Sequence, residues 1–254
     1  MSDEEEFGER FLSDNEKAFE KVFCDFHEAR EVMLQKEYEM NRKSFEENGY
    51  IVVSRHLVSD EMAELVTQYG VLEMLNSPEL PGDSQVPGTF SNYADTLTES
   101  LLHLTQGQIE SRTGKNLIPT YSYYRVYKAG DMLPDHTDRP ACEISATIMM
   151  GFRYDHGPIP PSTDYNWCLH GYVNGEKVYF PHSATGAVIY KGCELVHGRD
   201  RFDVNDYSYQ VQVFLHYVDA DGPYAEEHKY DKRPAIGLKK ETITRLYGDD
   251  STDR

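Results

Sequence analysis

The sequence predicts a single domain of mainly β structure, a barrel or sandwich, with helices that buttress one face. Short stretches rich in β-branched and aromatic residues recur at the spacing of neighbouring strands after residue 118, whereas helical patterns dominate before it. The length of 254 residues suffices for one large core. We expect one domain over 1–254, with a helical lead-in and support at 1–118, a barrel core at 119–219 and a C-terminal extension at 220–254.

The first helical segment spans about residues 14–47, which contain neither Gly nor Pro. Phe19, Val22, Phe23 and Phe26 occupy positions i, i+3, i+4 and i+7, which lie on one helix face. The pattern predicts one long or two shorter amphipathic helices, and we interpret the aromatic stripe as a packing face.

Boundary residues place the next two elements. Asn48-Gly49 ends the first helical segment, and the β-branched residues at 50–53 predict a short strand. Ser59 is a good N-cap for a second helix that runs to about Asn76.

Residues 77–92 contain three prolines and two glycines and are predicted to form a loop. Loops of this length often act as lids, although the sequence does not say what this one would cover. Residues 96–112 are again helical by composition and stop before Gly114. Beyond the barrel we expect a short solvated helix near 239–245 and a disordered end at 248–254.

The barrel strands follow from period-two and β-branched patterns. Asn174-Gly175 is the clearest turn among them, because this dipeptide supplies the two positive φ angles of a two-residue hairpin. The predicted strands are 119–127, 144–152, 167–173, 177–180, 187–190 and 209–218.

Charge and cysteine content limit the classes of function. The net charge of −19 repels phosphate backbones and anionic membranes, so we expect no nucleic-acid or membrane partner. No apolar stretch of about 18 residues occurs, and the N-terminus opens with acidic residues where a signal peptide has basic ones. The four cysteines show no C-x-x-C pairing, which favours free thiols in the cytoplasm.

His136-Thr137-Asp138 is the strongest candidate for chemistry. If this segment is extended, His136 and Asp138 point to the same side and can bind one ion together. His197 follows the predicted strand at 187–190 and could return to the same end of a barrel. Two imidazoles and one carboxylate would leave the remaining metal positions open, as ferrous oxygen chemistry requires.

The segment from Tyr127 through Gly130 to His136 and Asp138 resembles the Y-x-x-G-x-x-x-x-x-H-x-D run of Fe(II)/2-oxoglutarate-dependent dioxygenases, particularly those similar to prolyl hydroxylases. Residues 45–53, followed by the Ser59-capped helix, are similar to the lead-in of that superfamily, and residues 186–190 to its penultimate barrel strand. The resemblance covers about residues 44–219.

The resemblance implies a double-stranded β-helix, also called a jelly-roll or cupin barrel. It further implies that His136, Asp138 and His197 hold Fe(II) as the catalytic centre, with 2-oxoglutarate as cosubstrate and O2 as oxidant. The expected reaction is hydroxylation of a C–H bond in a peptide residue or small molecule, with release of succinate and CO2. Halogenases of this superfamily have a small residue in place of Asp138, which favours hydroxylation here.

The partner of the cosubstrate's distal carboxylate departs from the family pattern. Relatives of prolyl hydroxylases place Arg or Lys nine to eleven residues after the second His, where this chain has Asp206, Tyr207 and Ser208. The candidate replacements are Arg199, Arg201 and Arg125, because a guanidinium fork suits a carboxylate. Two further cosubstrate candidates are Tyr127, which matches the family tyrosine, and Gln210 on the last predicted strand.

Several interpretations stay open at this point. Arg139 is either a substrate contact or an ion-pair partner of Glu143. Trp167 and Tyr165 are core residues or pocket walls. The histidines at 156, 170 and 182 are interpreted as ordinary surface or core residues.

The alternative function is a barrel that binds a metal or ligand without turnover, as a sensor or structural module. The missing basic residue on the last strand is its main support.

Overall fold

The computed structural model describes residues 3–80, 82–154 and 166–238, with side chains from residue 16 onward. The helix predicted near 239–245 and the disordered end predicted at 248–254 lie outside the described residues. The helices are α1 (Asp3–Asn48), α2 (Asp60–Asn76), α3 (Thr96–Thr113) and α4 (Ala225–His228), with 3-10 turns η1 (Pro140–Cys142) and η2 (Lys229–Lys232).

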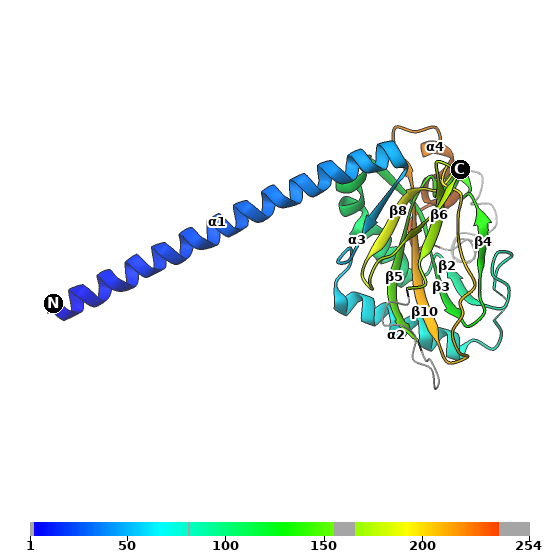
Figure 1. Cartoon of the computed structure of the whole chain (residues 1–254), viewed down its shortest axis with the longest axis horizontal. Helices are drawn as coiled ribbons and strands as arrows, with labels where there is room; N and C mark the ends of the chain where they lie inside the picture. The colour runs from blue at the N-terminus through cyan, green and yellow to red at the C-terminus, as the bar shows by residue number, and fades with distance from the viewer. Residues whose placement is uncertain (1–2, 81, 155–165, 239–254) are drawn as a thin grey trace.

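Two antiparallel sheets form the body of the molecule (Figure 1). The larger sheet has the order β1-β8-β5-β10-β3-β2, and the smaller one has the order β4-β9-β6-β7. The larger sheet contains β1 (Tyr50–Val53), β2 (Phe90–Tyr93), β3 (Leu117–Lys128), β5 (Ile144–Arg153), β8 (Ala187–Lys191) and β10 (Tyr209–Asp219), and the smaller contains β4 (Leu133–His136), β6 (Leu169–Val173), β7 (Glu176–Phe180) and β9 (His197–Arg199). The mainly β prediction is confirmed.

Alternation along β10 separates the two faces of the larger sheet. Val211, Val213 and Leu215 belong to the hydrophobic core that includes residues of α2 and α3. Gln210 and Gln212, on the opposite face, are also fully buried. A strand buried on both faces between helices and a second sheet must satisfy its polar side chains within the protein.

The caps of the two supporting helices agree with the sequence. The Ser59 side chain accepts a hydrogen bond from the Met62 backbone at the start of α2. Asp95 caps α3, and Gly114 ends it with φ of 73°, a left-handed conformation that favours glycine. Asn174 and Gly175 have φ of 53° and 82°, as the predicted two-residue hairpin between β6 and β7 requires.

Three short strands were not predicted from the sequence. β4 and β9 pair with each other, and β2 forms within the last part of the predicted loop at 77–92. Strands of three or four residues carry too little periodic pattern to be distinguished from a loop, and pairing with a neighbour stabilises them.

The helix α1 is a single helix of 46 residues that projects from the body (Figure 1). Only its C-terminal turns pack: Phe45 is buried, and Arg42 Nε donates to the Ser111 carbonyl at 2.8 Å. Phe19 and Phe26 of the aromatic stripe are 72 % and 64 % exposed. The prediction that this stripe packs against the rest of the chain is therefore wrong, because only the C-terminal turns of α1 contact the body.

Among the described residues, no helix is both long and apolar enough to span a membrane.

Candidate metal centre

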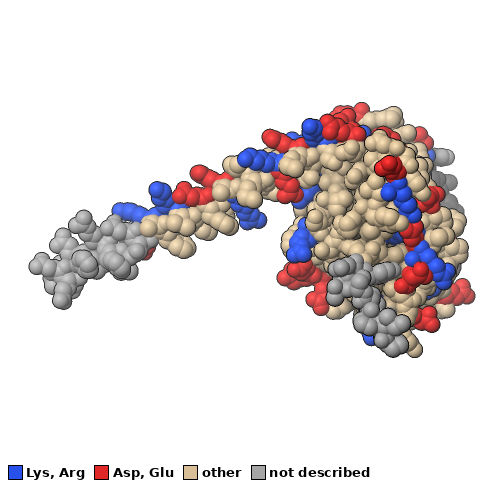
Figure 2. Space-filling view, in the orientation of Figure 1, with Lys and Arg blue, Asp and Glu red and all other residues tan. Residues whose placement is uncertain are grey.

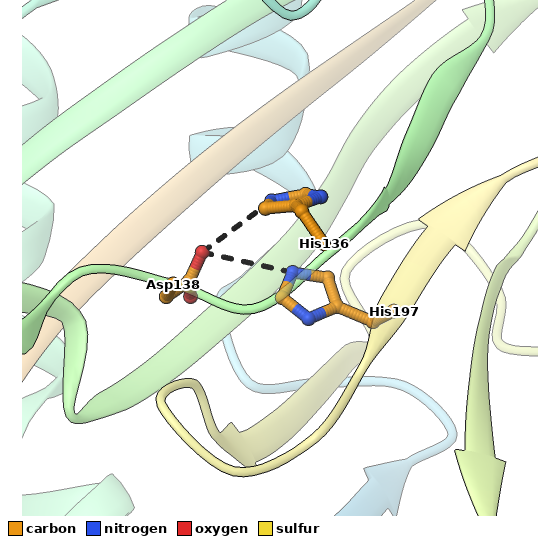
Figure 3. A group of neighbouring side chains, drawn as sticks. All are labelled: His136, Asp138 and His197. Carbon is orange, nitrogen blue, oxygen red and sulfur yellow. Dashed lines mark ion pairs between the residues drawn. The ribbon is translucent and has the colours of Figure 1, made fainter.

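The smaller sheet brings the predicted ligands together. His136 ends β4 and pairs in register with His197, the first residue of β9, and Asp138 follows β4 by two residues (Figure 3). Asp138 Oδ1 lies 3.5 Å from His136 Nε2 and 3.7 Å from His197 Nε2. The three side chains offer ligand atoms within 4.8 Å of one another, close enough to share one ion.

The second nitrogen of each imidazole is held by a backbone carbonyl. His136 Nδ1 lies 2.8 Å from the Pro134 carbonyl, and His197 Nδ1 lies 2.9 Å from the Leu195 carbonyl. A carbonyl accepts only, so each Nδ1 donates a proton and each Nε2 keeps a lone pair for a metal. Both rings thus have the tautomer that a ligand histidine needs.

Asp138 is positioned by its neighbours as firmly as the histidines. Ser145 Oγ donates to Asp138 Oδ2 at 2.9 Å, and the Asp138 backbone N–H donates to the Gly192 carbonyl at 2.8 Å. A Cβ on Gly192 would lie 2.1 Å from the Cys142 carbonyl oxygen, so only glycine fits there. The turn after β8 therefore contributes to the site through close backbone approach.

The electrostatics of Asp138 and His197 favour the protonation states that bind a metal, whereas the pKa of His136 lies above its ordinary value, because the hydrogen bonds with Asp138 and the Pro134 carbonyl outweigh the effect of burial. Burial raises the pKa of Asp138, but the hydrogen bond with His136 and the nearby His197 outweigh it, and the net pKa lies below the ordinary value. Burial lowers the pKa of His197. An ionised carboxylate beside a neutral imidazole is what a divalent cation requires.

The site opens into a cavity of about 380 Å³ between the two sheets. Residues Asp83, Ser84 and Gln85 of the loop before β2 line this cavity together with the three candidate ligands. Asp83 accepts a hydrogen bond from Tyr123 at 2.6 Å and forms an ion pair with Arg125. The loop is thereby fixed to β3.

Arg199, two residues after His197 on β9, is fully buried and is not among the residues that line this cavity, whereas Arg125 is. Arg199 Nη1 donates to the Trp167 carbonyl at 2.8 Å, and its guanidinium carbon lies 5.1 Å from the Trp167 ring centroid. Its Nε and Nη2 have no hydrogen-bond partner among the described residues. Burial lowers the pKa of Arg199. A buried cation with two free donors is a ready partner for an anion.

The other cosubstrate candidates occupy different places. Tyr127 is buried and accepts a hydrogen bond from Arg125 Nη1 at 2.9 Å. Gln210 donates to the Trp167 carbonyl at 3.2 Å, the same acceptor that Arg199 uses. Arg201 is exposed and pairs with Asp203 at 3.3 Å.

Arg139 has a partner that the sequence did not suggest. Both of its terminal nitrogens donate to Asp231, at 2.7 and 2.8 Å, and Asp231 comes from η2 of the C-terminal extension. Glu143 instead accepts from the Asp219 backbone at 2.8 Å. Of the two interpretations of Arg139, the ion pair with Glu143 is wrong, because Asp231, more than ninety residues away in sequence, pairs with the guanidinium. The substrate contact stays a prediction, and Arg139 lines the cavity.

His216 was missed, and the alternation of β10 could have revealed it. It continues the inward face of Gln212 and Phe214, and its Nδ1 lies 2.9 Å from Ser145 Oγ. Burial lowers the pKa of His216 to about 4. A neutral imidazole is thus hydrogen-bonded to the serine whose hydroxyl donates to Asp138.

The remaining histidine and aromatic candidates that the structure describes are buried and contact other residues of the protein. His170 is buried and bonded to Asp135 at 2.7 Å, and His182 is buried next to the Phe180 carbonyl. Trp167 is 5 % exposed and stacks on Phe202. His156 and Tyr165 lie outside the described residues.

The sequence matches no protein-family model and no curated protein. Solved structures similar to this chain include the epimerase SnoN in complex with Fe3+, α-ketoglutarate and nogalamycin RO (TM-score 0.56, 11 % identity, 72 % of this chain and 84 % of that one). A Pseudomonas putida prolyl-4-hydroxylase matches with TM-score 0.54 and 10 % identity over 70 % of this chain and 97 % of its own.

A Trichoplax adhaerens prolyl hydroxylase, in complex with a peptide of the oxygen degradation domain of hypoxia inducible factor, also matches. Its TM-score is 0.54 at 14 % identity, over 74 % of this chain and 93 % of that one. The fold is the jelly-roll fold of 2-oxoglutarate/Fe(II) oxygenases. The predicted double-stranded β-helix and the resemblance on which it rested are confirmed at the level of fold.

Proposed function

We propose that this protein is an Fe(II)- and 2-oxoglutarate-dependent oxygenase that hydroxylates a C–H bond of a peptide residue or small molecule. The observation that carries the proposal is the convergence of His136 Nε2, Asp138 Oδ1 and His197 Nε2 at the inner end of a cavity. Two neutral nitrogens and one carboxylate oxygen are the donor set of non-haem iron oxygenases. The bound iron, together with 2-oxoglutarate, supplies an oxidant made from O2, and succinate and CO2 are released.

We assign the distal carboxylate of 2-oxoglutarate to Arg199. The two free donors of its buried guanidinium can form the paired hydrogen bonds that a carboxylate accepts. Arg125 is less suited, because Asp83 and Tyr127 already occupy its guanidinium. An arginine two residues after the second histidine would then replace the basic residue that the last strand lacks.

The side chains around the iron ligands exclude water. Leu133, Leu169 and Phe214 line the cavity and have little exposure, and Asp83, Ser84 and Gln85 line it as well. A reactive oxidant needs such a shielded pocket, because water would otherwise quench it. The acidic surface supports a substrate that is neither nucleic acid nor membrane. The four free cysteines support a reducing compartment such as the cytoplasm.

Anaerobic titration tests the proposal. Fe(II) followed by 2-oxoglutarate should produce a weak visible charge-transfer band, which arises when the keto acid chelates iron at open positions. Changing any one of the three ligands (His136→Ala, Asp138→Ala or His197→Ala) should abolish the band and iron-supported turnover while the circular dichroism spectrum is unchanged. Full activity in one variant would remove that residue from the ligand set.

The competing function is a barrel that binds a metal or ligand without turnover, and the absence of a basic residue at Asp206, Tyr207 and Ser208 favours it. Such a protein would bind a divalent metal, but 2-oxoglutarate would produce no band and no succinate would form with any candidate substrate. The titration therefore separates the two functions.

A further inference from the structure

Within the described part of the chain, no segment covers the projecting part of α1 before Glu37, which pairs with Arg112 of α3 at 3.9 Å. Residues 16–37 are exposed on every side of the helix, and Figure 2 shows uncharged side chains between acidic and basic ones along it. A helix in water gains most of its stability from packing an amphipathic face. A segment of this length with phenylalanines in solvent therefore points to a partner that covers them.

The apolar residues repeat with the period of a coiled coil. Phe19, Phe26, Met33 and Met40 are spaced by seven, and Val22 and Ala29 lie three residues after the first two. This alternation of three and four residues is the a and d pattern of a two-stranded seam. Lys36 is the one polar residue at a d position within this run.

The seam faces away from the body. Met33 and Met40 are both 73 % exposed, whereas Phe45 is buried against the body. Phe45 lies five residues after Met40, so the two side chains point about 140° apart around the helix. A second helix can therefore lie along the seam as far as Met40 without meeting the body.

We propose that α1 pairs with α1 of a second copy of this chain as a parallel, in-register coiled coil. In this arrangement the g residue of one helix lies beside the e residue five positions later on the other. Asp25 then faces Arg30 of the second copy, and Ala18 faces Phe23, so this part of the seam has one attractive pair and no like-charge pair.

Antiparallel registers fit the charges less well. The register that sets Phe19 opposite Ala29 brings the two copies of Asp25 together, and the next registers set a phenylalanine opposite Lys36. In the parallel register Lys36 meets its own copy, at some cost in stability. Glu37 and Glu39 flank it, and its long side chain can extend to solvent.

The area is close to what a stable dimer needs. The exposed fractions along the stripe range from 55 % for Phe23 to 73 % for Met33 and Met40. Covering these side chains would bury on the order of 700 Å² per helix, against about 800 Å² per partner in a standard interface. The pairing would hold two barrels at one end of a shared stalk.

Sedimentation velocity on the full chain, at micromolar to tens of micromolar concentration, tests the pairing. The wild type should sediment at about twice the chain mass of 29.2 kDa. The double variant Phe19→Glu with Phe26→Glu should sediment as a monomer, because four carboxylates would meet in the seam. The matched variant Cys24→Glu with Gln35→Glu adds the same charge on the outer face and should remain a dimer.

Disulfide trapping tests the orientation. In a Cys24→Ser background, Val22→Cys should cross-link two chains under mild oxidation, because d residues of a parallel pair face each other. The native Cys24, on the outer face, should not cross-link. A monomeric wild type would overturn the proposal, and a dimer in which Val22→Cys does not cross-link would overturn the parallel register.

Discussion

Arg199→Met should stabilise the protein without ligand. The wild-type guanidinium is fully buried, and among the described residues only its Nη1 has a hydrogen-bond acceptor, the Trp167 carbonyl. An unpaired buried charge costs several kcal/mol, so an unbranched apolar side chain of similar length should raise the free energy of unfolding by about 1–4 kcal/mol. The Trp167 carbonyl keeps a donor in the variant, because Gln210 Nε2 also reaches it at 3.2 Å.

The same substitution should remove the response to cosubstrate. At 2-oxoglutarate concentrations of about 100 Kd, with a redox-inert divalent metal, the wild type should gain about 2.7 kcal/mol from binding. The variant should gain little, because the distal carboxylate has lost its guanidinium. Urea unfolding with and without 2-oxoglutarate, in the presence of the metal, measures both effects.

Arg125→Met is the control, because it should change the free energy of unfolding of the ligand-free protein in the opposite direction. It leaves Asp83 and Tyr127 without a cationic partner, so the free energy of unfolding should fall by about 1–3 kcal/mol. Its response to 2-oxoglutarate should persist. The assignment is refuted if Arg199→Met destabilises the ligand-free protein and still responds to 2-oxoglutarate, or if Arg125→Met abolishes the response.

Three further substitutions test the site and its support. Burial lowers the pKa of His182 to about 4, so the folded state disfavours the imidazolium and the free energy of unfolding falls as the pH drops from about 6.5 to 4. In urea unfolding, the free energy of unfolding of His182→Gln should fall by about 3 kcal/mol less than that of the wild type over this range. Ser145→Ala should weaken metal binding about 10- to 100-fold by calorimetry, since Asp138 loses its hydroxyl donor, and unchanged affinity would show that the serine does not orient the carboxylate. Gly192→Ala should lower the thermal midpoint and the metal affinity together, and a normal midpoint would contradict the close approach to Cys142.

The sequence predicted the elements whose stability is local. Ser59 caps a helix through a bond to a residue three positions on, and Asn174-Gly175 supplies its own turn angles. The pattern at 209–218 likewise predicted the last strand, which the structure has at Tyr209–Asp219.

Other parts of the site depend on contacts between distant segments. Asp83 of the loop before β2 pairs with Arg125 of β3, and Asp231 of the C-terminal extension pairs with Arg139. No local pattern encodes such pairs, since each carboxylate sits in a loop or turn whose path is set by packing. The candidate metal ligands could be predicted from the sequence because His136 and Asp138 are neighbours within a recognisable motif. Arg199 became the preferred anion partner only when its burial was known.

The pairing of β4 with β9 would give an ion bound at this site a role in folding. His136 and His197 belong to chain segments separated by the whole of β5 to β8, and in the folded protein they lie opposite each other. A metal bound by both would close this long loop only in the folded protein, so its binding free energy would add to the free energy of unfolding. Removal of the ion should therefore loosen the smaller sheet first, while the helix-backed larger sheet retains its own core.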